Sequence, residues 1–332
     1  MRIARALALV AIVWIQVQPA QAYLKFGVRA GGRTVTLKWA QIPVRYFVSS
    51  RNAVPGVTVG DFEAAVARAF AKWQAVPTAA ISYQYGGLTL ARPGEDDGSS
   101  TLGFESHPEL DRVLASTSFL IDRTNGTLIE SDIFFNSTFS WSVAANGETG
   151  RFDLESIALH EIGHFSGLGH SALGETELRE TGGRRVLSAE AVMFPIAFAP
   201  GSITGRTLKA DDIAGISDIY PDGDFDRKGS VSGRVLKNGV ALFGAHVVTF
   251  DPATRELVAG FTLNSQGEFS IGGLSPGPKV IRVEPLDDAD LDSFFDASQT
   301  IDVDFRVLLF DRLVVVPRGG DSGRFDLPVV PK

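Results

Sequence analysis

The sequence predicts an α+β domain followed by an all-β domain. Upstream of Pro221, three segments with apolar residues at helical spacing are interleaved with strand-like segments. From Val231 onward, strand-length runs of alternating polarity are separated by Asn-Gly, Gln-Gly and Pro-Gly turns. A chain of 332 residues also exceeds the usual size of one domain. We therefore expect domains at residues 23–221 and 231–332, joined by a linker at 222–230.

The first expected elements are a strand, a helix and a second strand. Residues 44–48 and 81–85 are strand-like, and the segment between them carries apolar residues three and four positions apart. Thr58 suits the N-cap of this helix, with Asp61 three residues later. The apolar positions are Phe62, Val66, Phe70 and Trp73. A unit of this length predicts a parallel pair of strands with a right-handed crossover.

A loop and a hairpin are expected next. Residues 91–100 are rich in Gly, Asp and Ser, which predicts a loop. Strand-like residues 113–121 and 128–135 flank Asn125-Gly126, a pair that favours a tight turn. The two segments therefore predict an antiparallel hairpin.

Two more helices complete the first domain. One is expected to start near Asp153 and to end at Gly167, because glycine adopts the positive φ that ends many helices. The other is expected over residues 208–219, just before Tyr220-Pro221. The apolar positions of the first are Leu154, Ile157, Ala158, Ile162 and Phe165, and those of the second are Ile213, Ile216 and Ile219.

Composition limits the class of partner. The chain has 39 acidic and 31 basic residues, for a formal charge of -8, and no basic run offers a track for phosphates, so nucleic acid is not an expected partner. The sequence contains no cysteine, which excludes disulfides, cysteine zinc ligands and a thiol nucleophile. An exported protein without cysteine favours a bacterial origin.

The N-terminus resembles a secretory signal peptide at residues 1–22. Arg2 and Arg5 precede the apolar run 6–17, and Ala20-Gln21-Ala22 provides a small-residue cleavage site. A membrane anchor is the alternative, but this run is shorter than the roughly 20 residues that cross a bilayer. We expect cleavage after Ala22, no membrane association afterwards, and a secreted (extracellular or periplasmic) protein.

The segment His160 to His170 reads HEIGHFSGLGH and contains three of the five histidines of the chain. Residues four apart lie on one side of a helix, so His160 and His164 can both face one ion. Neutral imidazoles suit zinc, and a catalytic zinc takes three protein ligands and leaves a position for water. Gly167 permits a sharp turn that returns His170 as the third ligand.

Glu161 follows the first of these histidines and points to the flank of the helix. It is therefore placed to accept a proton from water at the metal rather than to bind the ion, which is the role of a general base. The alternative is that the three histidines belong to an ordinary core. Each would then need its own buried hydrogen-bond partner.

These residues resemble the zinc-binding signature of the metzincins, and Ser171 after the third histidine is similar to the matrixin branch, to which matrix metalloproteinases belong. The likeness covers roughly residues 37–221. It implies an α+β metzincin (zincin) domain with a mixed twisted sheet and three helices, and a zinc endopeptidase activity. Met193 then lies in the Met-turn beneath the metal. The other similar segments are Ala191 to Pro195, Leu208 to Tyr220 and Val59 to Trp73.

The resemblance also implies how substrate binds. Residues 113–119 correspond to the edge strand that aligns an extended peptide through its backbone. Residues 195–198 would line the specificity pocket. The spacing between His170 and Met193 is longer than in matrixins, so residues 173–189 are expected to form an inserted loop near that pocket.

One zinc ion is expected. The histidines that hold a second, structural zinc in many matrixins have no counterparts here, where residues 132–135 read Asp-Ile-Phe-Phe. Calcium is possible because acidic residues lie in or beside loops, although solvated surface acids are the alternative. These acids are Glu95, Asp96, Asp97 and Asp132. Phe194 has no hydroxyl to serve as a further ligand, which points away from the astacin and serralysin branches.

Residues 231–285 resemble the prealbumin-like sandwich found beside carboxypeptidases, the carboxypeptidase-regulatory type. His246 lies on a predicted strand without a ligand-like neighbour, so we interpret it as structural. Strands are also expected at residues 303–310 and 313–316. The domain carries no visible chemistry, and it either docks substrate or cell-wall material or shields the first domain.

The sequence therefore predicts a secreted zinc endopeptidase that acts on protein or peptide. One alternative is a zinc-containing but non-catalytic binding protein that acts through its C-terminal sandwich. Another is a peptidase that processes a single partner. The sequence indicates neither the natural substrate nor the oligomeric state.

Overall fold

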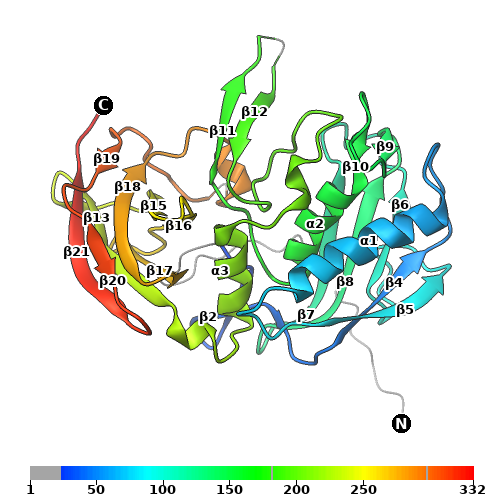
Figure 1. Cartoon of the computed structure of the whole chain (residues 1–332), viewed down its shortest axis with the longest axis horizontal. Coiled ribbons are helices and arrows are strands. Elements are labelled where there is room, and N and C mark those ends of the chain that lie inside the picture. The colour runs from blue at the N-terminus through cyan, green and yellow to red at the C-terminus, as the bar shows by residue number, and fades with distance from the viewer. Residues whose placement is uncertain (1–23, 181, 297) are drawn as a thin grey trace.

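The computed structural model describes residues 24–180, 182–296 and 298–332. The expected signal peptide at 1–22 lies outside these residues. Figure 1 shows a mixed α/β half beside a half made of strands, with a hairpin projecting between them. In the described part of the chain, no helix combines the length and the apolar character that a membrane span requires.

A six-stranded sheet forms the N-terminal half, with the strand order β3-β8-β6-β4-β5 and β7 paired only with β8. Its strands are β3 (Lys38–Trp39), β4 (Val44–Ser49), β5 (Tyr83–Thr89), β6 (Thr101–Glu105), β7 (Ala115–Asp122) and β8 (Thr127–Asn136). The parallel pair β4 and β5 and the antiparallel hairpin β7 and β8 confirm the sequence predictions. The strand β7 is the antiparallel edge of an otherwise parallel sheet.

The strand β6 was not expected from the sequence. It inserts between β4 and β8 directly after the glycine-rich loop. Its residues are buried in succession instead of alternating between core and solvent. A strand that is covered on both faces does not alternate between apolar and polar residues, so the sequence lacked the alternation that identifies a strand.

The helices α1 (Val59–Gln74) and α2 (Leu154–Phe165) pack against the sheet, and α3 (Ala210–Ile219) lies between the two halves of the molecule (Figure 1). Thr58 caps α1 in a capping box with Asp61, as the sequence predicted. The helix α1 packs against α2, where the Trp73 indole donates a 2.8 Å hydrogen bond to the Leu159 carbonyl. The core between helices and sheet is continuous and includes Phe62, Phe70, Phe135, Ile162 and Phe165.

Short elements connect these layers. They are β1 (Gly27–Ala30), β2 (Arg33–Thr36), β9 (Trp141–Ser142), β10 (Phe152–Asp153) and the 3₁₀ turns η1 (Thr204–Arg206) and η2 (Phe225–Arg227). The expected loop at residues 173–189 instead contains the antiparallel hairpin β11 (Gly174–Leu178) and β12 (Arg184–Ala189), which projects from the body (Figure 1). Its residues are mostly exposed or half-buried, so no apolar alternation indicated strands there.

The C-terminal β region, residues 229–329, consists of two packed sheets. One has the order β14-β13-β17 with β21 parallel to β13, and the other has the order β16-β15-β18-β19 with β20 also on β18. Its strands are β13 (Gly229–Lys237), β14 (Val240–Ala241), β15 (His246–Phe250), β16 (Leu257–Phe261), β17 (Glu268–Leu274), β18 (Gly277–Glu284), β19 (Leu308–Leu309), β20 (Val314–Val316) and β21 (Asp321–Val329). A separate apolar core fills the space between them. The family of this region and the domain boundaries stay predictions.

The end of the chain departs from expectation in one place. The strand predicted at residues 303–310 forms a ladder only at β19, Leu308–Leu309. The residues before β19 are irregular, and the apolar pattern there reflects the burial of Phe305 in the core rather than strand pairing. The strand expected at 313–316 is present as β20. His246 is buried on β15 with its Nδ1 3.0 Å from Glu284, which supports a structural role.

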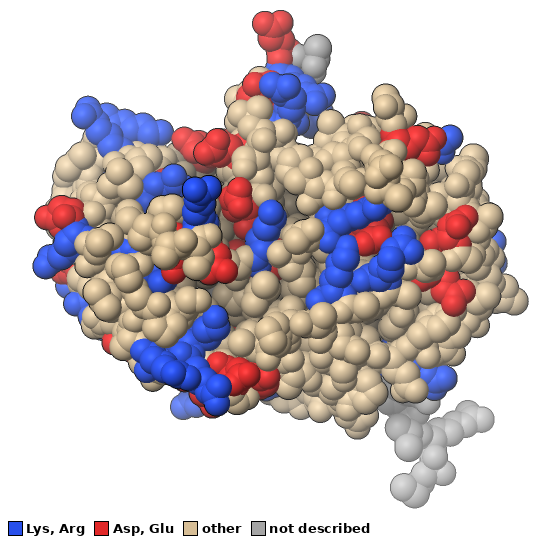
Figure 2. All heavy atoms as spheres, viewed as in Figure 1, with Lys and Arg blue, Asp and Glu red and all other residues tan. Residues whose placement is uncertain are grey.

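The two halves contact each other through buried and half-buried polar groups. The Asp211 carboxylate of α3 accepts a 2.9 Å hydrogen bond from the backbone N–H of Ala259 in β16. The Thr176 N–H of the hairpin donates a 2.8 Å bond to Asp288. On the face shown in Figure 2, acidic and basic side chains are interspersed.

Candidate active site

The helix α2 fixes the direction of the candidate ligands. Asp153 caps its first turn by accepting a 2.9 Å hydrogen bond from the Ser156 N–H, and Arg206 pairs with the same carboxylate. The helix ends at Phe165, and Gly167 adopts a φ of +102°, so the chain turns where the sequence predicted. This turn brings residues 168–170 back towards α2.

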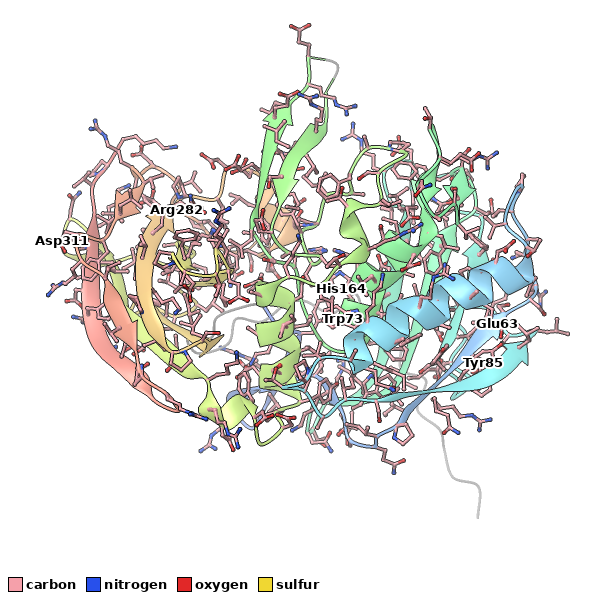
Figure 3. All side chains as sticks on the ribbon, in the orientation of Figure 1. Glu63, Trp73, Tyr85, His164, Arg282 and Asp311 are labelled. Carbon is pink, nitrogen blue, oxygen red and sulfur yellow. The ribbon has the colours of Figure 1, made fainter. Side chains whose placement is uncertain are left out.

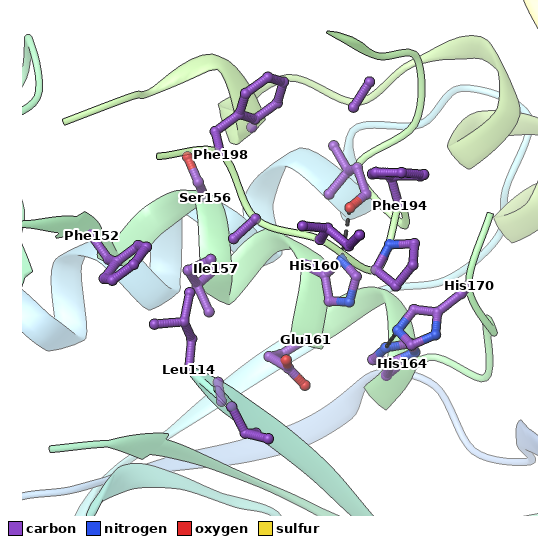
Figure 4. Close-up of a pocket in the computed structure, with 18 of the residues that line it drawn as sticks. Leu114, Phe152, Ser156, Ile157, His160, Glu161, His164, His170, Phe194 and Phe198 are labelled. Carbon is purple, nitrogen blue, oxygen red and sulfur yellow. Dashed lines mark hydrogen bonds between the residues drawn. The ribbon is translucent and has the colours of Figure 1, made fainter. Parts of the chain in front are cut away.

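The three histidine side chains converge. One nitrogen of each of His160, His164 and His170 lies within 4.8 Å of the other two, and the three rings face one another in Figure 4. The Nε2 atoms of His164 and His170 are 3.2 Å apart. Figure 3 shows His164 near the middle of the molecule.

Hydrogen bonds to main-chain carbonyls define the protonation of all three rings. The Nδ1 atoms of His160, His164 and His170 lie 2.7, 2.7 and 2.8 Å from the carbonyl oxygens of Val192, Leu168 and Ser293. A carbonyl can only accept, so each Nδ1 carries the proton. Each neutral ring therefore presents a bare Nε2 lone pair.

This donor set fits zinc. Two lone pairs that face each other at 3.2 Å repel unless a cation lies between them. Two nitrogens at zinc-ligand distance in a tetrahedral site lie about 3.3 Å apart. Burial also holds the pKa of all three histidines below the usual value, to about 3 for His160, which keeps the rings neutral. The protein therefore offers three neutral, preoriented nitrogen ligands.

Glu161 lies beside the histidines, with its carboxylate next to them in Figure 4. Burial raises its pKa to about 7, while a 2.6 Å hydrogen bond from the Thr117 hydroxyl opposes that shift. Glu161 is not a member of the three-histidine group that has metal-ligand geometry. A carboxylate with a raised pKa next to a metal-ligand set can exchange protons near neutral pH.

The Met-turn segment, Ala191 to Pro195, packs against the helix that carries His160 and His164. Gly163 of α2 approaches Met193 so closely that a Cβ at position 163 would lie 2.2 Å from the Met193 sulfur. The Asp212 carboxylate of α3 accepts hydrogen bonds from the N–H groups of Val192 and Met193, at 2.8 and 3.1 Å. Met193 is thus buried against the histidine helix, and its place beneath a metal ion stays a prediction.

A cavity of about 490 Å³ extends from the histidines along the edge strand. Residues 113–117 and 195–198 line it, as expected for the strand and the pocket segment. The apolar lining residues labelled in Figure 4 are Leu114, Phe152, Ile157, Phe194 and Phe198. Asp292 and Ser293 of the C-terminal β region also line it, although the sequence indicated no chemistry in that region.

Three of the four acidic residues proposed for calcium, Glu95, Asp97 and Asp132, accept hydrogen bonds from backbone N–H groups. Asp132 is buried and accepts 2.7 Å hydrogen bonds from the N–H groups of Gly94 and Thr101, and burial raises its pKa to about 7. Asp97 accepts a bond from the Ser99 N–H. Within residues 24–180, 182–296 and 298–332, the three histidines form the one group with metal-ligand geometry. Calcium binding stays a prediction.

Sequence reasoning missed three contributors to the site. Thr117 holds the base, Asp212 holds the Met-turn segment, and the Ser293 carbonyl holds the third histidine. Each is distant in sequence from the group that it contacts. A main-chain carbonyl is common to every residue and gives no sequence signal, so only the tertiary structure identifies it.

Comparison with known proteins identifies similar chains. The matrixin family profile matches residues 38–221. The chain is 32% identical over 168 residues to Metalloendoproteinase 1 of Glycine max, covering 48% of this chain and 45% of that protein. It is 28% identical over 189 residues to Metalloendoproteinase 4-MMP of Arabidopsis thaliana, covering 55% and 48%. The chain thus matches about half the length of these curated relatives.

Proposed function

Because the chain belongs to the matrixin family, we propose that it is an exported zinc endopeptidase that hydrolyses peptide bonds in protein or peptide substrates. The observation that carries this proposal is the convergence of three bare Nε2 lone pairs beside the Glu161 carboxylate. The names of the plant relatives, all metalloendoproteinases, support it. Export rests on the signal-like residues 1–22, and the bacterial origin stays a prediction.

In the proposed mechanism, His160, His164 and His170 hold one zinc ion. When bound, zinc supplies Lewis-acid chemistry, polarising a carbonyl and lowering the pKa of water. The Glu161 carboxylate takes a proton from the attacking water and then passes it to the nitrogen of the leaving amine. Thr117 stabilises the ionised form of that carboxylate.

The edge strand β7 supplies the proposed substrate platform. It pairs with β8 on one side only, and residues 113–117 line the cavity. An extended peptide can therefore add to its free edge through backbone hydrogen bonds, without a requirement for particular side chains. Residues 195–198 then receive a substrate side chain, and their apolar character favours an apolar one.

Metal content is the direct test. We expect the purified mature protein to bind one zinc ion per chain and to cleave an unfolded protein such as casein. Removal of the metal with a chelator should abolish cleavage, and zinc should restore it. Metal analysis together with a gel-based cleavage assay measures both. Zinc without cleavage of any substrate would favour the non-catalytic binding protein instead.

Thr117→Val is expected to shift the pH dependence of cleavage. The substitution removes the hydroxyl that stabilises the Glu161 carboxylate, so the pKa of Glu161 rises. The base acts in its ionised form, so the acid limb of the kcat/KM profile should move to higher pH while the rate well above that limb is largely retained. A profile measured from about pH 5 to 9 tests this. An acid limb at the wild-type position would show that Thr117 does not act on the base.

A further inference from the structure

The C-terminal β region reaches into the histidine cluster. The 3₁₀ turn η3 (Leu291–Ser293) follows β18 and lies at the cavity, where Asp292 and Ser293 form part of its lining. The Ser293 carbonyl oxygen is 2.8 Å from Nδ1 of His170. The next residue, Phe294, places its ring 6.5 Å from the His170 ring in an edge-to-face arrangement. One of the three candidate ligands thus contacts a segment more than 120 residues away in sequence.

His170 depends on this contact more than the other two histidines depend on theirs. His160 and His164 lie on α2, and their carbonyl partners, Val192 and Leu168, belong to the N-terminal half. His170 lies outside any helix or strand, after the bend at Gly167. No regular backbone bonding therefore restricts its side-chain direction. The Ser293 carbonyl selects the Nδ1–H tautomer and turns Nε2 towards the other rings.

The segment that carries Ser293 is firmly held. Phe294 and Phe295 are 1% and 4% exposed. They pack in an apolar cluster that joins both halves of the molecule, with Leu24, Ala172 and Phe194 from the N-terminal half and Phe261, Leu263 and Leu286 from the C-terminal β region. The backbone of the turn is closed by a 2.9 Å hydrogen bond from the Ser293 N–H to the Asp290 carbonyl. The carbonyl is therefore presented by a packed element.

We propose that the C-terminal β region completes the metal site, because the main-chain carbonyl of Ser293 positions the third zinc ligand, His170. This inference rests on the proposed zinc site. It assigns a role to a region outside residues 38–221, the part that matches the matrixin family. Ser293 acts through His170 and is a positioning residue. Zinc affinity should therefore depend on the packing of Phe294, which fixes the turn.

The test is the zinc affinity of full-length Phe294→Ala, measured by competition with a chromophoric chelator. Loss of an outer partner of a metal ligand commonly weakens metal binding by about 10- to 100-fold. We expect a loss of about 10-fold or more. Phe294→Leu, which retains most of the packing volume, should recover most of it. The matched control is Phe269→Ala, which removes an equally buried ring from the separate core of the C-terminal β region. The control should retain wild-type zinc affinity.

A second measurement uses the wild-type protein, so its result does not depend on whether a variant folds. In nitrogen-15 NMR spectra of the metal-free wild-type protein, His170 should give the signature of a neutral Nδ1–H tautomer with a slowly exchanging ring proton. An Nε2–H tautomer, or a fast exchange between the two, would overturn the proposal. Equal zinc affinities of Phe294→Ala and wild type would also overturn it. A wild-type protein that binds no zinc would instead reject the proposed function, so the two failures are distinguishable.

Discussion

Replacing Glu161 with glutamine is expected to slow peptide-bond cleavage at least about 100-fold while leaving zinc content unchanged. Glutamine keeps the size of the side chain but cannot take a proton from water. The three converging nitrogens belong to other residues, so the metal ligands remain in place. General acid and base catalysis contributes about 10²- to 10⁴-fold to such reactions. We therefore expect kcat to fall by about that factor, measured on casein alongside metal analysis of the same samples.

Glu177→Gln is the matched control for this prediction. The same change from carboxylate to amide is made at Glu177 on the strand β11, where the side chain pairs with Arg185 and is not part of the cavity lining. Its cleavage rate should equal that of the wild type. Cleavage by Glu161→Gln within a few-fold of the wild-type rate would reject Glu161 as the base.

A wild-type protein that is inactive on casein would require a different substrate search. Narrow processing of one partner would give this result, and so would a non-catalytic binding protein. Cleavage mapping across a complete proteome separates the two, because only a peptidase produces new chain termini. The Glu161→Gln protein is the reference for that experiment, since any cleavage that depends on this enzyme must be absent from it.

The parts of the site that lie close together in sequence were predictable from it. The ligand pair His160 and His164 needs only the helical repeat, and the capping residue Asp153 and the bend at Gly167 bound that helix. Local patterns also located α1 and the β7 and β8 hairpin. In each case, the residues that determine the element are within a few positions of one another.

The parts that depend on distant contacts were not predictable. The orientation of His160 follows from a relay in which Asp212 of α3 binds the Val192 N–H and the Val192 carbonyl binds the ring. The orientation of His170 follows from Ser293 in the C-terminal β region. In both cases the group that contacts the ring is a main-chain carbonyl, which every residue has. A sequence read without its fold therefore identifies the ligands and misses what orients them.

Gly167→Ala is expected to weaken zinc binding strongly and to destabilise the protein. At position 167 the φ of +102° is one that side chains with a Cβ rarely adopt, and a Cβ there would lie 2.5 Å from the buried Leu37 carbonyl oxygen. Backbone strain and overpacking together should cost at least about 2 kcal/mol. Relief of the overlap moves the bend, and His170 moves with it. Thermal unfolding and chelator competition measure the two effects separately.

Gly150→Ala separates the effect on the metal site from the cost of a positive φ alone. Gly150 has a φ of +78°, and no atom lies within 4 Å of a Cβ built there. This variant should lose only about 1–2 kcal/mol of stability. Its zinc affinity should be unchanged, because it lies before α2 and contacts none of the histidines. Wild-type zinc affinity in Gly167→Ala would mean that His170 reaches the other two ligands without this bend, and the glycine would then serve the helix end alone.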